Sequence, residues 1–147
     1  MPDPRPAAAL FLEAIPNVMC QLRNHLADSN SGLTVAQFRC LKMVQRRADV
    51  SLGELADANG VSAPAMSKLV DGLVGAGLLE RRASTGDRRR VELTVTGVGK
   101  RKLDTVGDRL KTRLAAQLSS LGADELAALE RALLRLNKVL AEPAMVA

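Results

Sequence analysis

Apolar residues recur every three or four positions along several stretches of this chain, which is the spacing of a helix with one buried face. The first such stretch carries Phe11, Ile15, Val18, Leu22 and Leu26. Pro16 interrupts this stretch, and because proline removes a backbone hydrogen bond we expect it to kink or divide the helix. A polar segment, residues 28–32, then predicts a loop.

The next two helices are marked by residues that cap the exposed amides of a first turn. Thr34 followed three residues later by Gln37 is a capping-box pattern, and Ser51 followed by Glu54 repeats it. Gly60 then favours a helix end, since glycine readily takes the positive φ found there. We therefore predict one helix that begins at Thr34 and a shorter one between Ser51 and Gly60.

A fourth helix is predicted to begin at Ser62, with Pro64 in its first turn, where the amide that proline lacks would have no intrahelical partner. Its apolar positions are Met66, Leu69, Val70 and Leu73. The helix continues to Gly77, and each of the glycines inside it, Gly72 and Gly75, lowers its stability by roughly 1 kcal/mol relative to alanine. We therefore expect this helix to depend on tertiary packing.

Alternating apolar and polar residues then predict two short strands, 78–82 and 90–95, joined by a polar turn over 84–88. Thr96 caps a long helix whose apolar positions extend to Leu121. A final helix carries leucines in the seam pattern of helix–helix packing, at Leu126, Leu129, Leu133, Leu136 and Leu140. The sequence thus predicts a mainly α fold with a small β-hairpin.

Positive charge is concentrated in one part of the chain. The net charge is +5, and the segment from Glu80 to Lys102 alone holds eight basic and three acidic residues, so the rest of the chain is balanced. A neutral body with one basic segment is typical of a surface that contacts phosphate. A solvated charged loop is the alternative interpretation of such a segment.

Several function classes find little support in the residues. His25 is the single histidine, no Ser/His/Asp or Cys/His set can be assembled, and Cys20 and Cys40 have no metal-ligand or redox spacing. We therefore expect no enzyme activity, no metal and no cofactor. No apolar run approaches the ~18 residues of a membrane span, and the N-terminus lacks a signal-peptide pattern, so we expect a reduced, cytoplasmic protein that does not associate with membranes.

The two short helices on either side of residues 59–62 form a candidate helix-turn-helix. The second of them begins with small residues, which let a helix approach a DNA groove closely, and the amides at its N-terminus favour phosphate. The hairpin that follows carries arginines near its tip, and arginine suits the negative potential of a narrow minor groove. Asp87 beside these arginines can orient one of them through bidentate pairing.

The order of these parts resembles the MarR family, the multiple-antibiotic-resistance type of bacterial regulator, over roughly residues 33–99. Four stretches carry the resemblance: Leu33-Thr34-Val35-Ala36-Gln37-Phe38; Leu52-Gly53-Glu54-Leu55-Ala56; Val61-Ser62-Ala63-Pro64-Ala65-Met66-Ser67-Lys68-Leu69-Val70; and Leu78-Leu79-Glu80-Arg81-Arg82 followed by Asp87-Arg88-Arg89. Each piece is loose, but four of them in order at the right distances form a specific signal.

The resemblance implies a winged helix-turn-helix region over residues 33–98, between an N-terminal dimerisation helix in 1–32 and C-terminal dimerisation helices in 99–147, all in one compact chain fold. The implied recognition-helix contacts are Ser62, Ala63, Ala65, Met66, Ser67 and Lys68. The implied wing residues are Arg81, Arg82, Ser84, Thr85, Asp87, Arg88, Arg89 and Arg90, with Arg89 in the minor groove and Asp87 as its orienting partner. The implied dimerisation residues are Phe11, Ile15, Leu126, Leu129, Leu133, Leu136 and Leu140.

By resemblance, the function is that of a sequence-specific, nucleoid-associated transcriptional regulator that binds a pseudo-palindromic operator in double-stranded DNA as a homodimer. A repressor that a small-molecule effector releases is the form we expect, although the residues indicate no particular effector. Three alternatives stay open: a non-specific architectural DNA-binding protein, a protein-interaction module that reuses the fold, and a thiol-based redox sensor. One branch of the family senses hydroperoxides through a cysteine in its first helix, aided by tyrosines. This chain has no tyrosine, so we expect Cys20 and Cys40 to be buried and inert.

Overall fold

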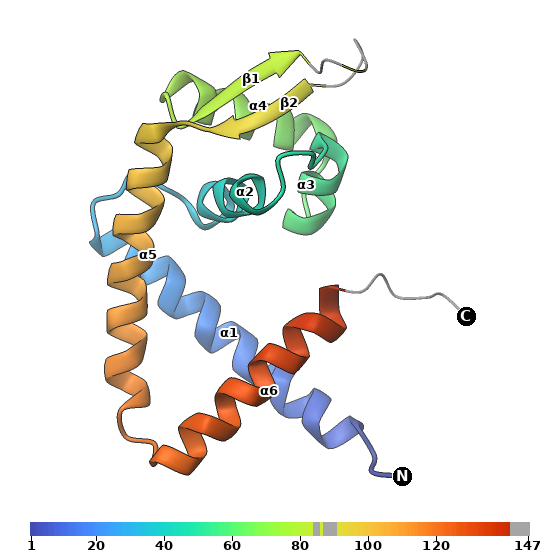
Figure 1. The fold of residues 1–147 in the computed structure, drawn as a ribbon, viewed down its shortest axis with the longest axis vertical. Helices are drawn as coiled ribbons and strands as arrows, with labels where there is room; N and C mark the ends of the chain where they lie inside the picture. The colour runs from blue at the N-terminus through green and yellow to red at the C-terminus, as the bar shows by residue number, and fades with distance from the viewer. Residues whose placement is uncertain (84–85, 87–90, 142–147) are drawn as a thin grey trace. The chain divides into compact units, whose positions relative to one another are not determined.

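In the computed structural model, which describes residues 1–83, 86 and 91–141, the chain forms six helices and one two-stranded antiparallel sheet (Figure 1). The elements are α1 (Arg5–Asp28), α2 (Val35–Arg46), α3 (Leu52–Asn59), α4 (Ala63–Gly75), β1 (Leu79–Ala83), β2 (Val91–Val95), α5 (Gly97–Leu118) and α6 (Ala123–Ala141). The chain divides into two compact units, Met1–Leu110 and Lys111–Ala147. The prediction of a mainly helical fold with a small hairpin is confirmed.

Helix α1 is continuous through Pro16, so of the two effects predicted for this proline, a kink or a division of the helix, the division is wrong. Proline inside a helix removes one hydrogen bond and costs about 3 kcal/mol. The helix has 24 residues, and its remaining backbone hydrogen bonds hold the chain helical on both sides of the proline. None of the helices in the described part of the chain is both long and apolar enough to cross a membrane.

The N-caps predicted from the sequence are present at all three short helices. At α2 the Thr34 hydroxyl accepts a hydrogen bond from the Gln37 amide at 3.2 Å, and the Gln37 side chain accepts one from the Thr34 amide at 2.9 Å. The Ser51 hydroxyl accepts from the Glu54 amide at 3.0 Å, and Ser62 caps α4 in the same way. The second capping box is only half formed, because the Glu54 carboxylate accepts from the Ser51 hydroxyl instead of its amide.

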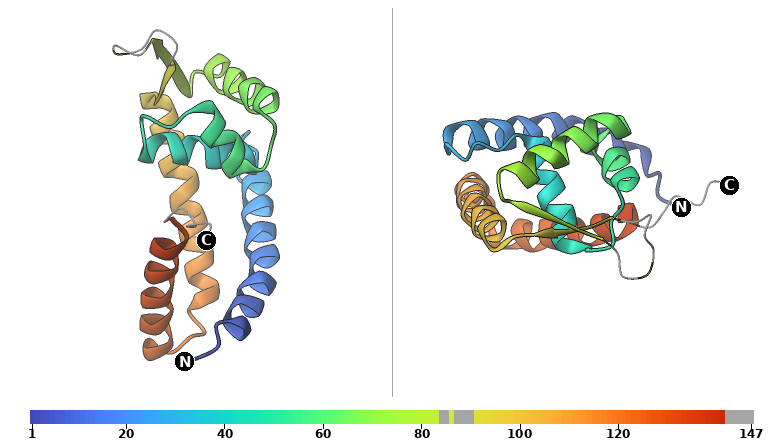
Figure 2. Two further views of the ribbon diagram at one scale, coloured as in Figure 1. Left: turned by 90° about the vertical axis from the view of Figure 1, so that its right-hand side faces the viewer. Right: turned by 90° about the horizontal axis from the view of Figure 1, so that it is seen from above.

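The core of the first unit is aliphatic and lies between α2, α3, α4, the hairpin and the first turns of α5 (Figures 1 and 2). Its most deeply buried large side chains are Leu41, Leu55, Met66, Leu73, Leu79, Leu93 and Leu103. Burial of a leucine contributes about 1.5–3 kcal/mol, so this set holds the three short helices against the sheet. Phe38 of α2 is the aromatic side chain in this core.

The hairpin pairs β1 with β2 from Leu79 opposite Val95 to Ala83 opposite Val91. Thr96 joins the base of this hairpin to α5, since its amide donates to the Leu78 carbonyl at 3.1 Å and its hydroxyl accepts from the Gly99 amide at 3.0 Å. Thr96 therefore caps α5, as the sequence predicts. Gly99 packs closely against the Leu78 carbonyl. A Cβ added to Gly99 would lie 2.3 Å from the Leu78 carbonyl oxygen.

Candidate nucleic-acid interface

The turn between α3 and α4 is fixed by backbone hydrogen bonds. Gly60 has a φ of +64°, and the amide of Val61 donates back to the Ala56 carbonyl at 3.1 Å. On the α2 side, the Arg39 guanidinium donates to the Ala58 carbonyl at 2.7 Å. Because carbonyls at the end of a helix have no intrahelical partner, Arg39 closes the end of α3 and ties α2 to the turn from which α4 begins.

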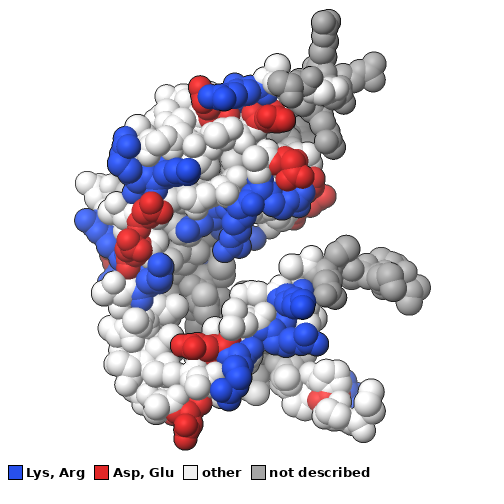
Figure 3. All heavy atoms as spheres, viewed as in Figure 1, with Lys and Arg blue, Asp and Glu red and all other residues white. Residues whose placement is uncertain are grey.

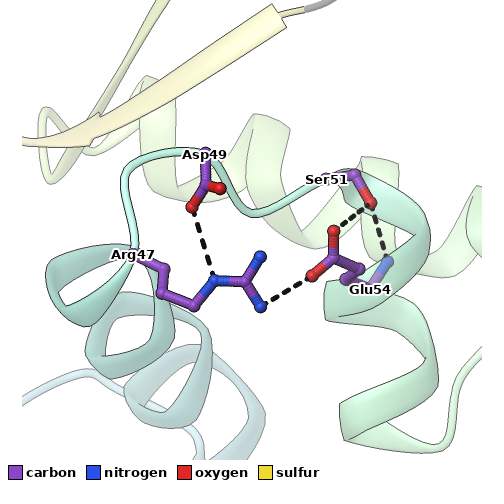
Figure 4. Close-up of polar contacts among 4 residues, drawn as sticks. All are labelled: Arg47, Asp49, Ser51 and Glu54. Atoms are coloured by element: carbon purple, nitrogen blue, oxygen red, sulfur yellow. Dashed lines mark hydrogen bonds and ion pairs between the residues drawn. The ribbon is translucent and has the colours of Figure 1, made fainter.

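A second set of polar contacts links the end of α2 to the start of α3 (Figure 4). The Arg47 guanidinium lies 2.9 Å from the Glu54 carboxylate and 3.4 Å from that of Asp49. The hydrogen bond with Asp49, followed by the negative charge of Glu54, raises the pKa of Arg47 above its usual value. These groups are exposed, so the contacts orient the linker more than they stabilise the fold. Sequence patterns did not reveal either contact.

Most of the predicted recognition residues line the open side of α4. Ser62, Ala63, Ala65 and Lys68 are exposed, and Ser67 is half-buried. Together they form a surface of small and polar side chains with one ammonium group. We call these five residues the α4 surface.

The inclusion of Met66 among the DNA contacts is wrong, because its side chain is fully buried in the core. Met66 lies one helical turn before Val70, which is also buried, and both point away from the α4 surface. The argument from free amides at the start of α4 also weakens. Pro64 has no amide hydrogen, and the Ala65 amide donates to the Ser62 hydroxyl at 3.3 Å.

The hairpin is tied to α4 by an ion pair between Arg81 of β1 and Asp71 of α4. In the strand register Arg81 lies opposite Leu93, whose side chain is buried, so Arg81 is on the side of the hairpin that packs on the core. This contact makes Arg81 a positioning residue between wing and helix. Asp71 has no sequence motif that would have revealed it.

Of the other predicted wing residues, the structure describes Arg82 alone. Arg82 is exposed and pairs with Glu80 at 3.2 Å. The remaining ones, Ser84, Thr85, Asp87, Arg88, Arg89 and Arg90, lie outside the described residues. Arg81 and Arg82 are thus each paired with an acidic side chain. Among the described basic residues of the segment 80–102, this leaves Lys100, Arg101 and Lys102 of α5 without an ion pair to another described residue. In Figure 3, Lys and Arg spheres lie along the edge where Figure 1 places the first half of α5, with Asp and Glu spheres beside them.

Two helices present apolar side chains that this single chain leaves open. On α1, Phe11 is 37% and Ile15 39% exposed. On α6, no side chain is buried, and Leu133 and Leu140 are 46% and 62% exposed. The other three leucines of the α6 seam, Leu126, Leu129 and Leu136, are half-buried. Exposed apolar faces of this kind are typical of protein–protein interfaces.

The two cysteines occupy different environments. Cys40 is fully buried, and burial raises the pKa of its thiol to about 11. Cys20 is exposed, so the expectation that it is buried is wrong. It lies about half a turn round α1 from Phe11 and Ile15. A helical projection of the sequence would therefore have placed it on the side opposite the apolar face of this helix. Its sulfur accepts a hydrogen bond from the Asn24 amide group at 3.6 Å.

This difference predicts selective thiol labelling. At pH 8 only roughly one Cys40 thiol in a thousand is ionised, and the buried sulfur is out of reach of reagents. We expect a disulfide reagent such as Ellman's to react with one thiol per native chain, at Cys20, and with a second only after unfolding in guanidinium. The variant Cys20→Ser is the control and should react only when unfolded; equal rates for both thiols of the native wild-type protein would contradict the assignment.

His25, the single histidine, is buried. Among the residues that the structure describes, no group of three or more His, Cys, Asp or Glu side chains is arranged to hold a metal ion.

A model of the MarR family matches residues 31–90 of this chain. The HTH-type transcriptional repressor Rv2887 of Mycobacterium tuberculosis is 31% identical over 97 residues, which are 64% of this chain and 70% of the relative. The HTH-type transcriptional regulator FarR of Neisseria gonorrhoeae is 26% identical over 129 residues, covering 88% and 87% of the two chains. These relatives share sequence with this chain over the helix-turn-helix and beyond it.

Solved structures resemble the chain over most of its length. The crystal structure of RV1404 from Mycobacterium tuberculosis has a TM-score of 0.79 at 25% identity and covers 99% of both chains. The structure of Rv2887 in complex with salicylic acid has a TM-score of 0.71 at 26% identity and covers 86% of this chain and 93% of the other. The agreement therefore includes α1, α5 and α6 as well as the winged helix.

Proposed function

This chain belongs to the MarR family of transcriptional regulators, and from that premise we propose that it binds duplex DNA sequence-specifically through the α4 surface and the hairpin. The observation that carries the proposal is the α4 surface itself, Ser62, Ala63, Ala65, Ser67 and Lys68. Its side chains are small enough for the helix to approach base edges in a major groove. Lys68 adds a contact to the phosphate backbone, which strengthens binding in a salt-dependent way.

The support for this orientation is the set of contacts that hold α4 in place. Arg39 closes the end of α3, and Asp71 pairs with Arg81 of the hairpin. A recognition helix and a wing that are connected in this way can be presented to adjacent grooves as one rigid piece. In the proposed complex, Arg89 enters the minor groove next to the major groove that takes α4.

We propose that the regulator is a homodimer formed through the open apolar faces of α1 and α6. The support is the exposure of Phe11, Ile15, Leu133 and Leu140 in the single chain. A two-fold dimer would place its two α4 helices in successive major grooves, ~34 Å apart, and the operator would then be a pseudo-palindrome.

We further propose that a small molecule controls DNA binding and that the regulator acts as a repressor. Rv2887 is named a repressor, and its structure was solved with salicylic acid. In this chain a hollow of about 470 Å³ lies between the end of α1 and the start of α2. It is lined by Arg23, Leu26, Ala27, Leu33, Thr34, Val35 and Ala36. Apolar walls with one guanidinium group suit an apolar carboxylate.

The substitution Arg89→Ala tests the DNA-binding proposal. Removal of the guanidinium from the minor groove is expected to weaken operator binding at least about tenfold, or roughly 1.4 kcal/mol, as measured by fluorescence anisotropy at near-physiological salt. Helicity and oligomeric state should not change.

Lys138→Ala provides a matched control for the loss of one positive charge. Lys138 lies on α6, about half a turn round the helix from its leucine face, which is formed by Leu126, Leu129, Leu133, Leu136 and Leu140. That variant should bind the operator with wild-type affinity. Wild-type affinity in Arg89→Ala would contradict the wing assignment, and an equal loss in both variants would indicate non-specific attraction by net charge.

A further inference from the structure

A second hollow, open to solvent, lies between the α1–α2 loop and one face of α5. It lies wholly within the first unit and is distinct from the one lined by Arg23. Its volume is about 260 Å³, and its polar lining residues are Ser29, Ser31, Arg101, Lys102, Thr105 and Arg109. It is smaller than the roughly 300–1,000 Å³ typical of sites for drug-sized ligands. We call it the α5 hollow.

The α5 hollow contains three positive charges and no negative one. Lys102 and Arg109 are seven residues apart and lie on the same face of α5, and Arg101, about 100° round the helix from Lys102, also lines the hollow. The acidic residues of this stretch, Asp104 and Asp108, are not among the lining residues. None of the three cations forms an ion pair or hydrogen bond with a side chain in the described part of the chain.

Lys102 is the most informative of the three because it is half-buried. Its ammonium group reaches the loop and lies 3.9 Å from the position that a Cβ on Gly32 would occupy. Three positive charges that line one hollow, with no acidic side chain among its lining residues, favour a bound anion.

Hydrogen bonds within the α1–α2 loop hold its conformation. The hydroxyl groups of Ser29 and Ser31 both donate to the Leu26 carbonyl, at 3.1 and 3.2 Å, and Ser31 also accepts from the Leu33 amide. Ser31 is itself buried. These hydroxyls hold the rim of the hollow, so the binding charge has to come from the three cations.

We propose that the α5 hollow binds an oxyanion of the phosphate class through Arg101, Lys102 and Arg109. Guanidinium groups match the geometry of tetrahedral oxyanions, and three cations can balance a ligand that carries two or more negative charges. The phosphate could belong to a small molecule or to the DNA backbone. The proposal does not rest on sequence-specific DNA binding, because the hollow, its charge and its binding to a free anion are properties of the chain alone.

Calorimetric titration of the purified protein with inorganic pyrophosphate at low ionic strength, in the absence of DNA, tests this site. We expect binding that sodium chloride of equal ionic strength does not reproduce, and Lys102→Gln should weaken it at least about tenfold. The matched control is Lys100→Gln, which removes the same charge from an exposed position on the same helix outside the hollow and should change the affinity less than about twofold. Thermal melting of both variants checks that the fold is intact.

Binding of a random-sequence duplex by the same variants distinguishes the two sources of the phosphate. If the ligand is a free molecule, Lys102→Gln will bind the duplex as the wild type does. If it is the DNA backbone, pyrophosphate will compete with the duplex, and Lys102→Gln will lower the slope of log affinity against log salt by about one where Lys100→Gln does not. The proposal is overturned if pyrophosphate binds wild type and Lys102→Gln equally, or if both substitutions weaken its binding to the same extent.

Discussion

The double substitution Leu133→Glu, Leu140→Glu is expected to convert the proposed dimer into a monomer. Both leucines are open to solvent in the single chain and lie on the leucine face of α6. Burial of an unpaired carboxylate in an apolar interface costs several kcal/mol. Two such groups per chain should raise the dimer dissociation constant by at least about 10³-fold. Size-exclusion chromatography with light scattering at micromolar concentration measures the change, and operator affinity should fall with it because the two half-sites are no longer bound together.

Leu134→Glu is the matched control for this experiment. Leu134 lies on the same helix and is 73% exposed, but it points roughly 100° away from the leucine face. This variant should remain a dimer with wild-type affinity for DNA. A wild-type protein that is monomeric at micromolar concentration, or a double variant that stays dimeric, would contradict the proposed interface.

Gly99→Ala is expected to destabilise the first unit by at least about 3 kcal/mol, a fall of roughly 10 °C in melting temperature. The added Cβ would lie 2.3 Å from the Leu78 carbonyl oxygen and 2.9 Å from a methyl group of Val95. The oxygen belongs to the backbone at the start of the hairpin and also accepts from the Thr96 amide, so it cannot move without breaking the junction between hairpin and α5. Thermal unfolding followed by circular dichroism measures the loss.

Gly107→Ala separates this steric effect from the general effect of alanine in a helix. Gly107 lies two turns further along α5, where the nearest atom to a new Cβ is the flexible Lys42 ammonium at 3.9 Å. Alanine is a better helix former than glycine by up to ~1 kcal/mol, so this variant should be as stable as the wild type or more stable. If Gly99→Ala melts within a degree or two of Gly107→Ala, the close approach at Leu78 does not exist in solution.

The sequence predicted those features that depend on neighbouring residues. The caps formed by Thr34, Ser51 and Ser62 each join atoms three residues apart, so a short motif contains all the information. The end of α3 at Gly60 is equally local. The starts of α2, α3 and α4, the end of α3 and the two strands could therefore be placed within a residue or two.

The sequence did not predict contacts between elements. The pairs Asp71–Arg81 and Arg47–Glu54 join residues seven to ten positions apart across a turn or a linker, and no spacing rule favours them over other acid–base pairs. Met66 received two conflicting interpretations, as a core residue and as a DNA contact, and the packing of α4 on the core decided between them. Burial on a helix depends on which face the neighbours cover, which a motif alone does not specify.

Selection of bound sequences from a random duplex pool, with purified protein at near-physiological salt, tests the central claim most directly. We predict recovery of an inverted repeat whose half-sites lie about one helical turn, ~34 Å, apart. Loss of that enrichment in Arg89→Ala would assign it to the winged helix. Recovery of DNA without a common motif, or of no DNA at all, would contradict the proposal that this chain is a dimeric, sequence-specific regulator.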